Sequence, residues 1–347
     1  MNQKKLLIFM PSIEGGGVEK NFFLITNYLG DKFKNVTVIT VDKSIKKKLS
    51  KKVNIIGPNS NIWNSKSRYP KYFICLIYLF FFVVLNRKTL IFSFQANAYA
   101  TLIAKLFGKS IITRSNTSPV GWSKNTLKKI FYKIILMLPD KVIVNSKVFK
   151  QEIDKKFGIK SYVIYNPLNK SFIIKQSKSK VMLNFFKRNH LKLINIARLA
   201  DQKDQITLLK ALNFIDIKKI QLLIIGSGKK EKMLKNFIIQ EKLKTKVKII
   251  PFKKNPYKFM KLADIFLLTS KFEGLPNVLL EAQTLKKYII STDCPTGPKE
   301  ILLNGKAGDL VKVGDFKSIV RKIKFFQKNK KKLKKKIIKG YSELKRF

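Results

Sequence analysis

The sequence of 347 residues is poor in the side chains that build covalent frameworks and metal sites. It has two cysteines, Cys75 and Cys294, which exclude a disulfide framework and a cysteine-rich zinc site. Its one histidine, His190, leaves no pair of imidazole ligands for a metal. No Asp-x-Asp pair occurs anywhere, which removes the commonest carboxylate pair for holding a metal-bound nucleotide.

Acidic residues are also scarce, because 20 Asp and Glu stand against 73 Lys and Arg, for a formal net charge of +53. Such a charge suggests an anionic partner, which could be nucleic acid, an anionic membrane face or a phosphorylated substrate. A compositional explanation competes with this one, since Lys, Ile, Asn and Phe are all abundant and all have codons built from A and T. We favour the compositional explanation over a nucleic-acid role, because the lysines are spread along the whole chain and no nucleic-acid-binding signature is present.

One uncharged stretch, Tyr72–Leu85, is long enough for a helix but shorter than the about 20 residues that span a membrane. Basic residues flank it, with Arg68 and Lys71 before it and Arg87 and Lys88 after it. Two interpretations stay open. The segment is either a core helix under a sheet or a helix that lies in the membrane interface, which its basic flanks and its Phe- and Tyr-rich faces favour.

Apolar, strand-like runs alternate with helical patterns along the chain, which predicts parallel sheets with right-handed crossovers. The runs of the first series are Lys5–Met10, Val36–Val41, Val53–Ile56, Leu90–Ser93, Ser110–Thr113, Val142–Asn145 and Tyr162–Tyr165. Those of the second series are Leu191–Ile196, Ile220–Ile225, Val247–Ile250, Ile265–Leu268, Tyr288–Ser291 and Asp309–Val311. We therefore expect an α/β protein with two doubly wound parallel-sheet domains.

The expected domains cover residues 1–168 and 190–330. Residues 169–189 contain many lysines and serines without a clean period and are interpreted as the linker. A basic, amphipathic terminal helix is expected at Phe316–Lys336, and residues 331–347 are interpreted as a basic C-terminal helix or tail. In doubly wound sheets, ligands bind outside the carboxyl ends of the strands.

A glycine-rich loop, with Gly15, Gly16 and Gly17, follows the first expected strand and opens a helix. Consecutive glycines let backbone N–H groups approach an anion closely, and the start of the helix adds favourable partial charge. The spacing matches neither the dinucleotide fingerprint nor the P-loop. A tight strand-to-helix turn explains these glycines about as well as a phosphate site does.

Two further constellations follow strands of the second series. Arg198 and Lys203 lie five residues apart after Leu191–Ile196, so both can point at one anion. The forked guanidinium of an arginine and the compact charge of a lysine together suit a diphosphate. Glu273 and Glu281 follow Ile265–Leu268, with Pro276 placed at the first turn of a helix. Carboxylates beside free helix N–H groups, at Asn277 and Val278, suit a polyhydroxyl compound with phosphate.

The spacing Glu273-x7-Glu281, with Arg198 and Lys203 upstream and a glycine-rich first loop, resembles the retaining GT-B glycosyltransferases of family 4. Further matching stretches are Ile224–Gly228, Pro251-Phe252, Asn255-Pro256-Tyr257, Ala263-Asp264 and Asp293–Leu302. The last is similar to a segment of enzymes that build O-antigen, capsule and lipid-linked oligosaccharides. The resemblance is dense in residues 190–315 and looser in residues 1–165, as expected if that half binds variable acceptors.

The resemblance implies a GT-B architecture, in which two Rossmann-like domains face a central cleft, the first binding the acceptor and the second the nucleotide sugar. It implies that Glu273 holds the hydroxyls of the donor sugar, that Glu281 holds the ribose, and that Arg198 and Lys203 neutralise the departing diphosphate. It places the donor also on Gly274, Leu275, Pro276, Asn277, Val278, Gly226 and Phe252. The loop at Gly15, Gly16 and Gly17 would approach the donor phosphate or the acceptor.

One departure from the family concerns a histidine that some members carry in the first domain, near the donor sugar. Ile112–Thr117 occupies the corresponding position here and contains no histidine. Either Arg114 or Asn116 is expected to line the acceptor side of the site, or this branch does without that contact.

The function implied is retaining transfer of a hexose or N-acetylhexosamine, from a nucleotide diphosphate sugar that we expect to be UDP-linked, to a polyprenyl-diphosphate-linked saccharide or lipopolysaccharide. Members are generally metal-independent, in agreement with the missing Asp-x-Asp pair, so no cofactor is expected. We expect a cytoplasmic enzyme, peripheral on the inner face of the cell membrane and in contact with anionic lipid. A nucleic-acid-binding protein and a GT-B sugar epimerase or phosphorylase are the alternatives.

Overall fold

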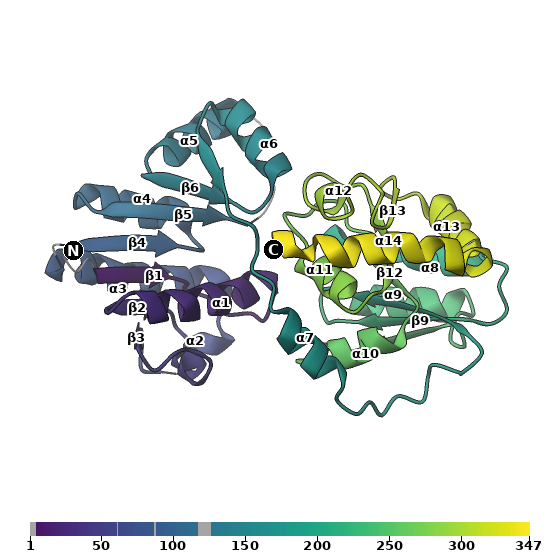
Figure 1. Ribbon diagram of the computed structural model, residues 1–347. Helices are drawn as coiled ribbons and strands as arrows, with labels where there is room; N and C mark the ends of the chain where they lie inside the picture. Colours follow the sequence, from purple (N-terminus) through teal and green to yellow (C-terminus); the bar gives the residue numbers. More distant parts are fainter. Residues whose placement is uncertain (1–4, 61, 87, 117–125) are drawn as a thin grey trace. The chain divides into compact units, whose positions relative to one another are not determined.

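The computed structural model describes residues 5–60, 62–86, 88–116 and 126–347. The chain divides into two compact units, Met1–Pro167 (unit 1) and Leu168–Phe347 (unit 2), and each unit has a parallel sheet of its own (Figure 1). The prediction of an α/β protein with two parallel sheets is therefore confirmed.

Unit 1 is built on a seven-stranded sheet with the strand order β3-β2-β1-β4-β5-β6-β7. Its strands are β1 (Lys5–Phe9), β2 (Val36–Ile39), β3 (Val53–Ile56), β4 (Thr89–Ser93), β5 (Ser110–Ser115), β6 (Lys141–Val144) and β7 (Ser161–Val163). The order reverses at β1, which pairs with both β2 and β4. The carboxyl end of β1 is thus a topological switch point, where sheets of this kind bind ligands.

Helices cover both faces of this sheet. They are α1 (Gly17–Lys32), α2 (Ile62–Ser65), α3 (Arg68–Leu85), α4 (Asn97–Leu106), α5 (Thr126–Met137) and α6 (Lys147–Phe157). The side chains of β1 alternate between two hydrophobic clusters, as the pleat of a strand requires. Ile8 packs in the cluster that contains Phe22 of α1, whereas Leu7 packs in the cluster that contains Leu79 of α3 and Ala100 of α4.

Unit 2 has a six-stranded sheet with the order β10-β9-β8-β11-β12-β13. Its strands are β8 (Leu191–Ile196), β9 (Ile220–Ile225), β10 (Val247–Ile250), β11 (Ile265–Leu268), β12 (Tyr288–Thr292) and β13 (Asp309–Val311). Its helices are α7 (Lys170–Ser177), α8 (Gln205–Phe214), α9 (Glu231–Gln240), α10 (Tyr257–Leu262), α11 (Asn277–Thr284), α12 (Pro298–Ile301), α13 (Phe316–Lys328) and α14 (Lys330–Ser342). The switch point of this sheet is β8, between β9 and β11.

Every strand-like run of the sequence is a strand in the structure, with ends that differ by at most two residues. The single terminal helix expected at Phe316–Lys336 was wrong, because the chain leaves the helical conformation at Asn329 (φ −124°). The break gives two helices, and each packs on the sheet of unit 2 by its own apolar residues, Ile323 and Phe326 on α13 and Leu333 on α14.

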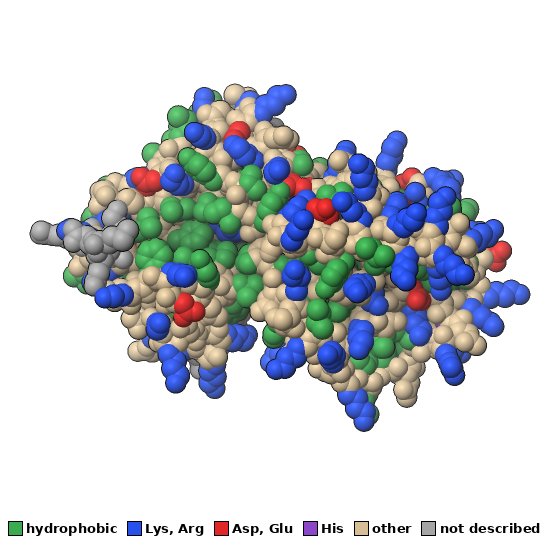
Figure 2. Space-filling model, viewed as in Figure 1, with side chains coloured by type: hydrophobic (Ala, Val, Ile, Leu, Met, Phe, Trp, Pro, Cys, Tyr) green, Lys and Arg blue, Asp and Glu red, His purple; other side chains and the backbone are tan. Residues whose placement is uncertain are grey.

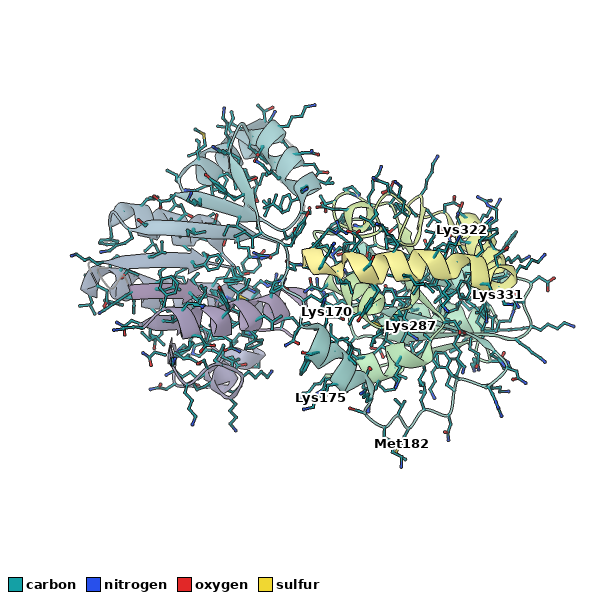
Figure 3. All side chains as sticks on the ribbon, in the orientation of Figure 1. Lys170, Lys175, Met182, Lys287, Lys322 and Lys331 are labelled. Atoms are coloured by element: carbon teal, nitrogen blue, oxygen red, sulfur yellow. The ribbon has the colours of Figure 1, made fainter. Side chains whose placement is uncertain are left out.

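A buried carboxylate ties these last two helices to the sheet. Asp309, at the start of β13, accepts a hydrogen bond of 2.5 Å from Lys336 Nζ on α14, and Lys322 Nζ on α13 lies 3.6 Å from its other oxygen. Figure 3 labels Lys322 on α13 and Lys331 near the start of α14. Residues 331–347 therefore belong to the body of unit 2, where α14 runs along β12 (Figure 1).

Residues 169–189, interpreted from the sequence as a linker, belong to unit 2 and contain the helix α7. Asn169 begins this helix, and its side chain accepts a hydrogen bond from Phe172 N. The segment is held to the loop before α10 and to α10 itself, because Asn255 Nδ2 donates to Gln176 O at 2.9 Å and Lys258 Nζ donates to Lys180 O at 3.1 Å. Polar contacts of this kind leave no periodic signal, which is why the sequence suggested only a connection.

The uncharged segment Tyr72–Leu85 forms most of α3, which combines features of both interpretations. Cys75, Leu79 and Val83 are buried against the sheet, as a core helix requires. Phe73 and Phe81, on the opposite face, are mostly exposed. Among the described residues, α3 is the one helix that is long and apolar enough to cross a membrane.

Candidate active site

The predicted donor-site residues of unit 2 follow strands that are neighbours in its sheet. Arg198 and Lys203 follow β8, Gly226 follows β9, and Glu273 follows β11. Since the order is β9-β8-β11 and all pairs are parallel, these loops emerge from the same edge, around the switch point. The fold therefore brings together side chains that are up to 75 positions apart in the sequence.

An ion pair stands at the centre of this edge. Lys203 Nζ donates to Glu273 Oε1 at 2.5 Å, and the side chains are 17% and 8% exposed. Ser270 Oγ donates to the same oxygen, also at 2.5 Å. Among the described residues, no hydrogen bond to Glu273 Oε2 is found. One carboxylate oxygen is thus fixed by two donors, and the other can accept a hydrogen bond from a ligand hydroxyl.

The loop of Glu273 is locked from two sides. From the side of β8, Gln202 Nε2 donates to Phe272 O at 2.8 Å, and Lys271 N donates to Gln202 O at 2.8 Å. From the side of β12, Thr296 Oγ1 donates to Gly274 O at 3.1 Å. A Cβ atom at Gly297 would lie 2.0 Å from Gly274 O, so only glycine permits this approach. The Glu273 carboxylate therefore has a fixed position before any ligand binds.

Glu281 lies on α11, which begins directly after the Glu273 loop. Pro276 is the last residue before this helix rather than a residue of its first turn, and Asn277 and Val278 open it. Glu281 is buried, and Tyr257 Oη donates to its Oε1 at 3.3 Å. The start of α11 is half-buried, which leaves room for an anion near its first N–H groups.

The loop after β9 approaches the loop after β8 very closely. A Cβ atom at Gly226 would lie 1.9 Å from Ala197 O, so the glycine has a packing reason beside its predicted donor contact. Phe252, in the loop after β10, has a side chain that is 56% exposed, and its N–H donates to Ser227 Oγ at 3.1 Å. An exposed ring with a fixed backbone offers a flat surface on which a planar base can stack.

Arg198 is the exposed member of the predicted set. Its carbonyl accepts a hydrogen bond of 2.9 Å from Gln205 Nε2, which fixes its backbone, while its guanidinium extends from the loop after β8. An exposed guanidinium at a strand end can swing onto a phosphate with little loss of existing contacts. Lys and Arg side chains are numerous on the face of unit 2 that Figure 2 shows, so the charge of that face favours the approach of an anionic ligand.

The glycine loop of unit 1 contains a carboxylate that the sequence interpretation did not consider. Glu19, in the first turn of α1, is buried, and its Oε1 accepts a hydrogen bond of 3.2 Å from Glu14 N. A Cβ atom at Gly16 would lie 2.9 Å from Glu19 Oε2, so the glycine gives this carboxylate its place. The predicted contact of Gly15, Gly16 and Gly17 with a phosphate or an acceptor stays a prediction.

Arg114 lies inside unit 1 rather than on its surface, with 1% of its side chain exposed. Its guanidinium donates to Asn116 Oδ1 at 3.3 Å, to Ile164 O at 3.1 Å and to Asn166 Oδ1 at 2.9 Å. Burial lowers the pKa of Arg114 to about 10. The residue thus holds the ends of β5 and β7 together, whereas Asn116 is half-buried and nearer to solvent.

The sequence interpretation gave no role to Ser270, Tyr257 and Thr296, which position the two glutamates. Their signal was weak, because hydroxyl side chains are common in loops at strand ends. Cys294 also borders the site, where burial and the Glu273 carboxylate raise the pKa of its thiol to about 12. It is therefore a neutral thiol near neutral pH and no candidate nucleophile.

In the part of the chain that the structure describes, no group of three His, Cys, Asp or Glu side chains could hold a metal ion. The cations at this edge are instead the chain's own side chains, Arg198 and Lys203. An oxygen ligand that gains negative charge next to them would be stabilised, which is the electrostatic demand of transferring a group away from a diphosphate.

Known proteins share both the sequence and the fold. Residues 183–343 match the family model of glycosyl transferases group 1. An uncharacterized glycosyltransferase of Methanocaldococcus jannaschii, MJ1059, is 31% identical over 217 residues, which are 57% of this chain and 53% of that protein. The chain thus spans about half the length of this relative.

A second relative matches over most of both chains. It is the N-acetylgalactosamine-N,N'-diacetylbacillosaminyl-diphospho-undecaprenol 4-alpha-N-acetylgalactosaminyltransferase of Campylobacter jejuni, which is 25% identical over 92% of this chain and 89% of that protein. Among solved structures, Anabaena HepE in complex with UDP and glucose has a TM-score of 0.79 at 17% identity, over 99% of this chain and 95% of that one.

These likenesses concern the fold of the chain and the family of its residues 183–343. The fold is that of the GT-B glycosyltransferases, with two Rossmann-like units. Residues 183–343 form a domain of the glycosyl transferases group 1. The predicted donor-site residues of unit 2 lie within that domain, whereas the glycine loop and Arg114 lie in unit 1.

Proposed function

We propose that the protein moves a hexose or N-acetylhexosamine, with retention of configuration, from a UDP-linked donor to a lipid-linked saccharide in cell-surface polysaccharide synthesis. The observation that carries the proposal is the Lys203–Glu273 pair at the carboxyl ends of β8 and β11. The pair places a cation for the diphosphate beside a carboxylate for the sugar hydroxyls. A nucleotide sugar needs both groups close together, because its sugar is bonded directly to its diphosphate.

Several contacts support a nucleotide sugar as the donor. Glu281, held by Tyr257 Oη, can accept hydrogen bonds from ribose hydroxyls, and the exposed ring of Phe252 can stack on the base. The start of α11, at Asn277 and Val278, offers N–H groups to phosphate oxygens. UDP is our choice of nucleotide because HepE, with the same fold, was solved with UDP and glucose.

The proposed reaction needs no other reactant. The bond between the anomeric carbon and the β-phosphate oxygen breaks, and the acceptor hydroxyl bonds to that carbon on the same face. The proton of the acceptor passes to the departing phosphate oxygen. Arg198 and Lys203 neutralise the leaving diphosphate, so we propose that transfer proceeds without a divalent metal.

The acceptor is proposed from the C. jejuni relative, whose name gives a diphospho-undecaprenol saccharide as its acceptor. We propose the same chemical class here, a polyprenyl-diphosphate-linked saccharide, with lipopolysaccharide as the second candidate. An acceptor of this kind is anchored in a bilayer, so the enzyme is proposed to be cytoplasmic and peripheral on the inner face of the cell membrane. The net charge of +53 supports contact with anionic lipid there.

The test is a transfer assay with purified UDP-sugars and a short-chain polyprenyl-diphosphate-linked saccharide. We expect one UDP-sugar to give a product in which proton NMR shows the anomeric configuration of the donor. Turnover should persist in EDTA. A product of inverted configuration would contradict retention, and activity lost in EDTA and restored by Mg²⁺ would contradict the metal-free mechanism.

Glu241→Gln provides a matched control, because this glutamate lies at the end of α9, away from the carboxyl ends of the strands, and its Oε2 accepts a hydrogen bond of 2.6 Å from Asn213 Nδ2. The control should transfer at the wild-type rate, whereas Glu273→Gln should not. A chain that transfers no sugar from any nucleotide donor, but whose melting temperature rises with RNA, would support the nucleic-acid alternative instead.

A further inference from the structure

Three consecutive helices of unit 1 are unusually apolar on their exposed side. Nearly half of the large hydrophobic side chains that are exposed among the described residues lie on α3, α4 and α5. They are Tyr69, Phe73, Ile77, Phe80, Phe81, Val84 and Leu85 on α3, Tyr99, Leu102 and Leu106 on α4, and Leu127, Ile130, Phe131, Ile134 and Met137 on α5. We call this set the three-helix face.

Topology puts the three helices on one side of the sheet. They connect β3 to β4, β4 to β5 and β5 to β6, and these crossovers advance in the same direction along the strand order. Right-handed crossovers that advance in one direction lie on the same side of a sheet. Neighbouring helices are in contact, α3 with α4 and α4 with α5. The ring centroid of Phe80 on α3 lies 5.3 Å from that of Phe107, just after α4.

The three-helix face is separate from the side of the helices that packs on the sheet. The side of α3 and α4 that packs on the sheet is a separate set, which includes Cys75, Leu79, Ala100 and Ala104, all fully buried. The exposed aromatic side chains lie outside this buried set, and monomeric soluble proteins rarely carry an apolar surface of this extent without a use for it.

The charge of the same region is of one sign. The sequence has no Asp or Glu between Asp42 and Asp140, a stretch that includes all three helices. Lys129 and Lys133 are exposed among the apolar residues of α5, and Lys66 and Lys88 are exposed just before and just after α3. The face is thus apolar and aromatic, and its charged side chains are basic.

We propose that the three-helix face is the surface by which the protein seats on an anionic lipid bilayer. Phe, Tyr and Leu side chains can enter the boundary between headgroups and acyl chains, while the lysines contact anionic headgroups. A second copy of this chain is disfavoured as the occupant, because pairing two such faces would bring lysines of the same sign together. The helices lie in the interface and do not span, since α3 stays packed on the sheet through Cys75 and Leu79.

This inference deepens the proposed function, because an acceptor anchored in lipid must be met at a bilayer. It extends the expectation from Tyr72–Leu85 alone to α4 and α5. The surface is nevertheless tested separately from the reaction, since vesicle binding requires neither donor nor acceptor.

The experiment is flotation of the full chain with vesicles of phosphatidylcholine containing phosphatidylglycerol, or of phosphatidylcholine alone. The double variant Phe131→Ser/Ile134→Ser removes two exposed side chains of α5. We expect it to lower the partition coefficient on the anionic vesicles by about tenfold or more. Its matched control, Tyr28→Ser/Ile239→Ser, removes exposed side chains of α1 and α9 and should bind as the wild type does.

A second pair of variants tests charge. Lys129→Glu/Lys133→Glu should lower binding to the anionic vesicles more than Lys244→Glu/Lys248→Glu does, although both change the net charge equally. Wild-type binding should also be stronger to the anionic vesicles than to phosphatidylcholine alone and should weaken with salt.

Each variant is first checked for an unchanged melting temperature and an unchanged far-UV circular dichroism spectrum. A folded α5 variant that floats like the wild type would overturn the proposal. The proposal would also be overturned if the wild type does not float and sedimentation velocity shows that it is a dimer, whereas the α5 variant is a monomer. If the α5 variant fails to float while the wild type floats, and neither protein transfers sugar, the membrane surface would be upheld and the proposed reaction rejected.

Discussion

Lys203 Nζ lies 2.5 Å from Glu273 Oε1, although the two residues are 70 positions apart in the sequence. The pair joins the loop after β8 to the loop after β11 at the switch point of unit 2. Buried ion pairs add little net stability, since the loss of hydration offsets much of the attraction. A pair kept at this position, with one carboxylate oxygen open, is better explained by the ligand than by the fold.

Glu273→Gln should lower kcat of transfer by about 10²- to 10³-fold, because a neutral amide cannot accept sugar hydroxyls as a carboxylate does. The substitution preserves shape, so the melting temperature should fall by only a few degrees. Steady-state kinetics of the variant beside the control Glu241→Gln checks this expectation. Turnover near that of the wild type would refute the role of Glu273.

Lys203→Ala should lower both transfer and stability. The stability loss should be about 3–5 kcal/mol, because a buried Glu273 carboxylate is left without its cation. In Lys203→Ala/Glu273→Gln the uncompensated charge is gone, so urea denaturation should show most of the stability restored while transfer stays low. If the double variant were active, the pair would be structural and not catalytic.

Phe252→Ala should raise KM for the donor by about tenfold and leave kcat nearly unchanged, because stacking on the base stabilises ground state and transition state alike. Phe325→Ala, on α13, removes another exposed ring and serves as the matched control. Equal KM values for the two variants would place the base elsewhere.

Lys287 should give the protein a measurable pH dependence of stability. Its Nζ donates to the carbonyls of Lys261 and Ala263, and burial lowers its pKa from 10.5 to about 8. Between these values the unfolded chain binds more protons than the folded one, so the folded state gains stability as the pH rises from 8 to 10.5. Below pH 8 the residue is protonated in both states, and the cost of burying its charge is fully present.

The measurement compares urea denaturation of the wild type with that of Lys287→Met at pH 7.5 and at pH 10.5. The difference should move in favour of the wild type by up to about 3 kcal/mol as the pH rises. The other lysines lose their charge in both proteins and cancel in this difference. A difference that is independent of pH would show that Lys287 titrates like an exposed lysine.

The sheets could be predicted from the sequence because buried parallel strands are continuous apolar runs, as in Ile220–Ile225. Family resemblance, together with positions after strands, implied that Lys203 and Glu273 belong to one donor site, but the ion pair between them was not predicted. The hydrogen bond from Ser270 Oγ to Glu273 could not be predicted, because a hydroxyl three residues away in a loop leaves no periodic signal.

Two features ran against sequence expectations for a physical reason. Arg114 was one of two candidates, with Asn116, for the acceptor side of the site, but three acceptors, two of them about 50 positions later, hold it inside unit 1. The apolar surface of α4 and α5 was not foreseen, because composition does not tell which side of a helix packs on a sheet. Only the buried set, with Ala100 and Ala104, shows that the other side faces outward.

The most direct test of the account is thermal shift with a panel of nucleotide sugars, measured on the wild type and on Glu281→Ala. A ligand that binds the folded state raises the melting temperature in proportion to its affinity. The account predicts that one UDP-sugar raises the melting temperature of the wild type and does not raise that of Glu281→Ala. The variant without ligand should still show a cooperative melting transition, which indicates that it is folded. No shift with any nucleotide sugar, or a shift that Glu281→Ala retains in full, would contradict it.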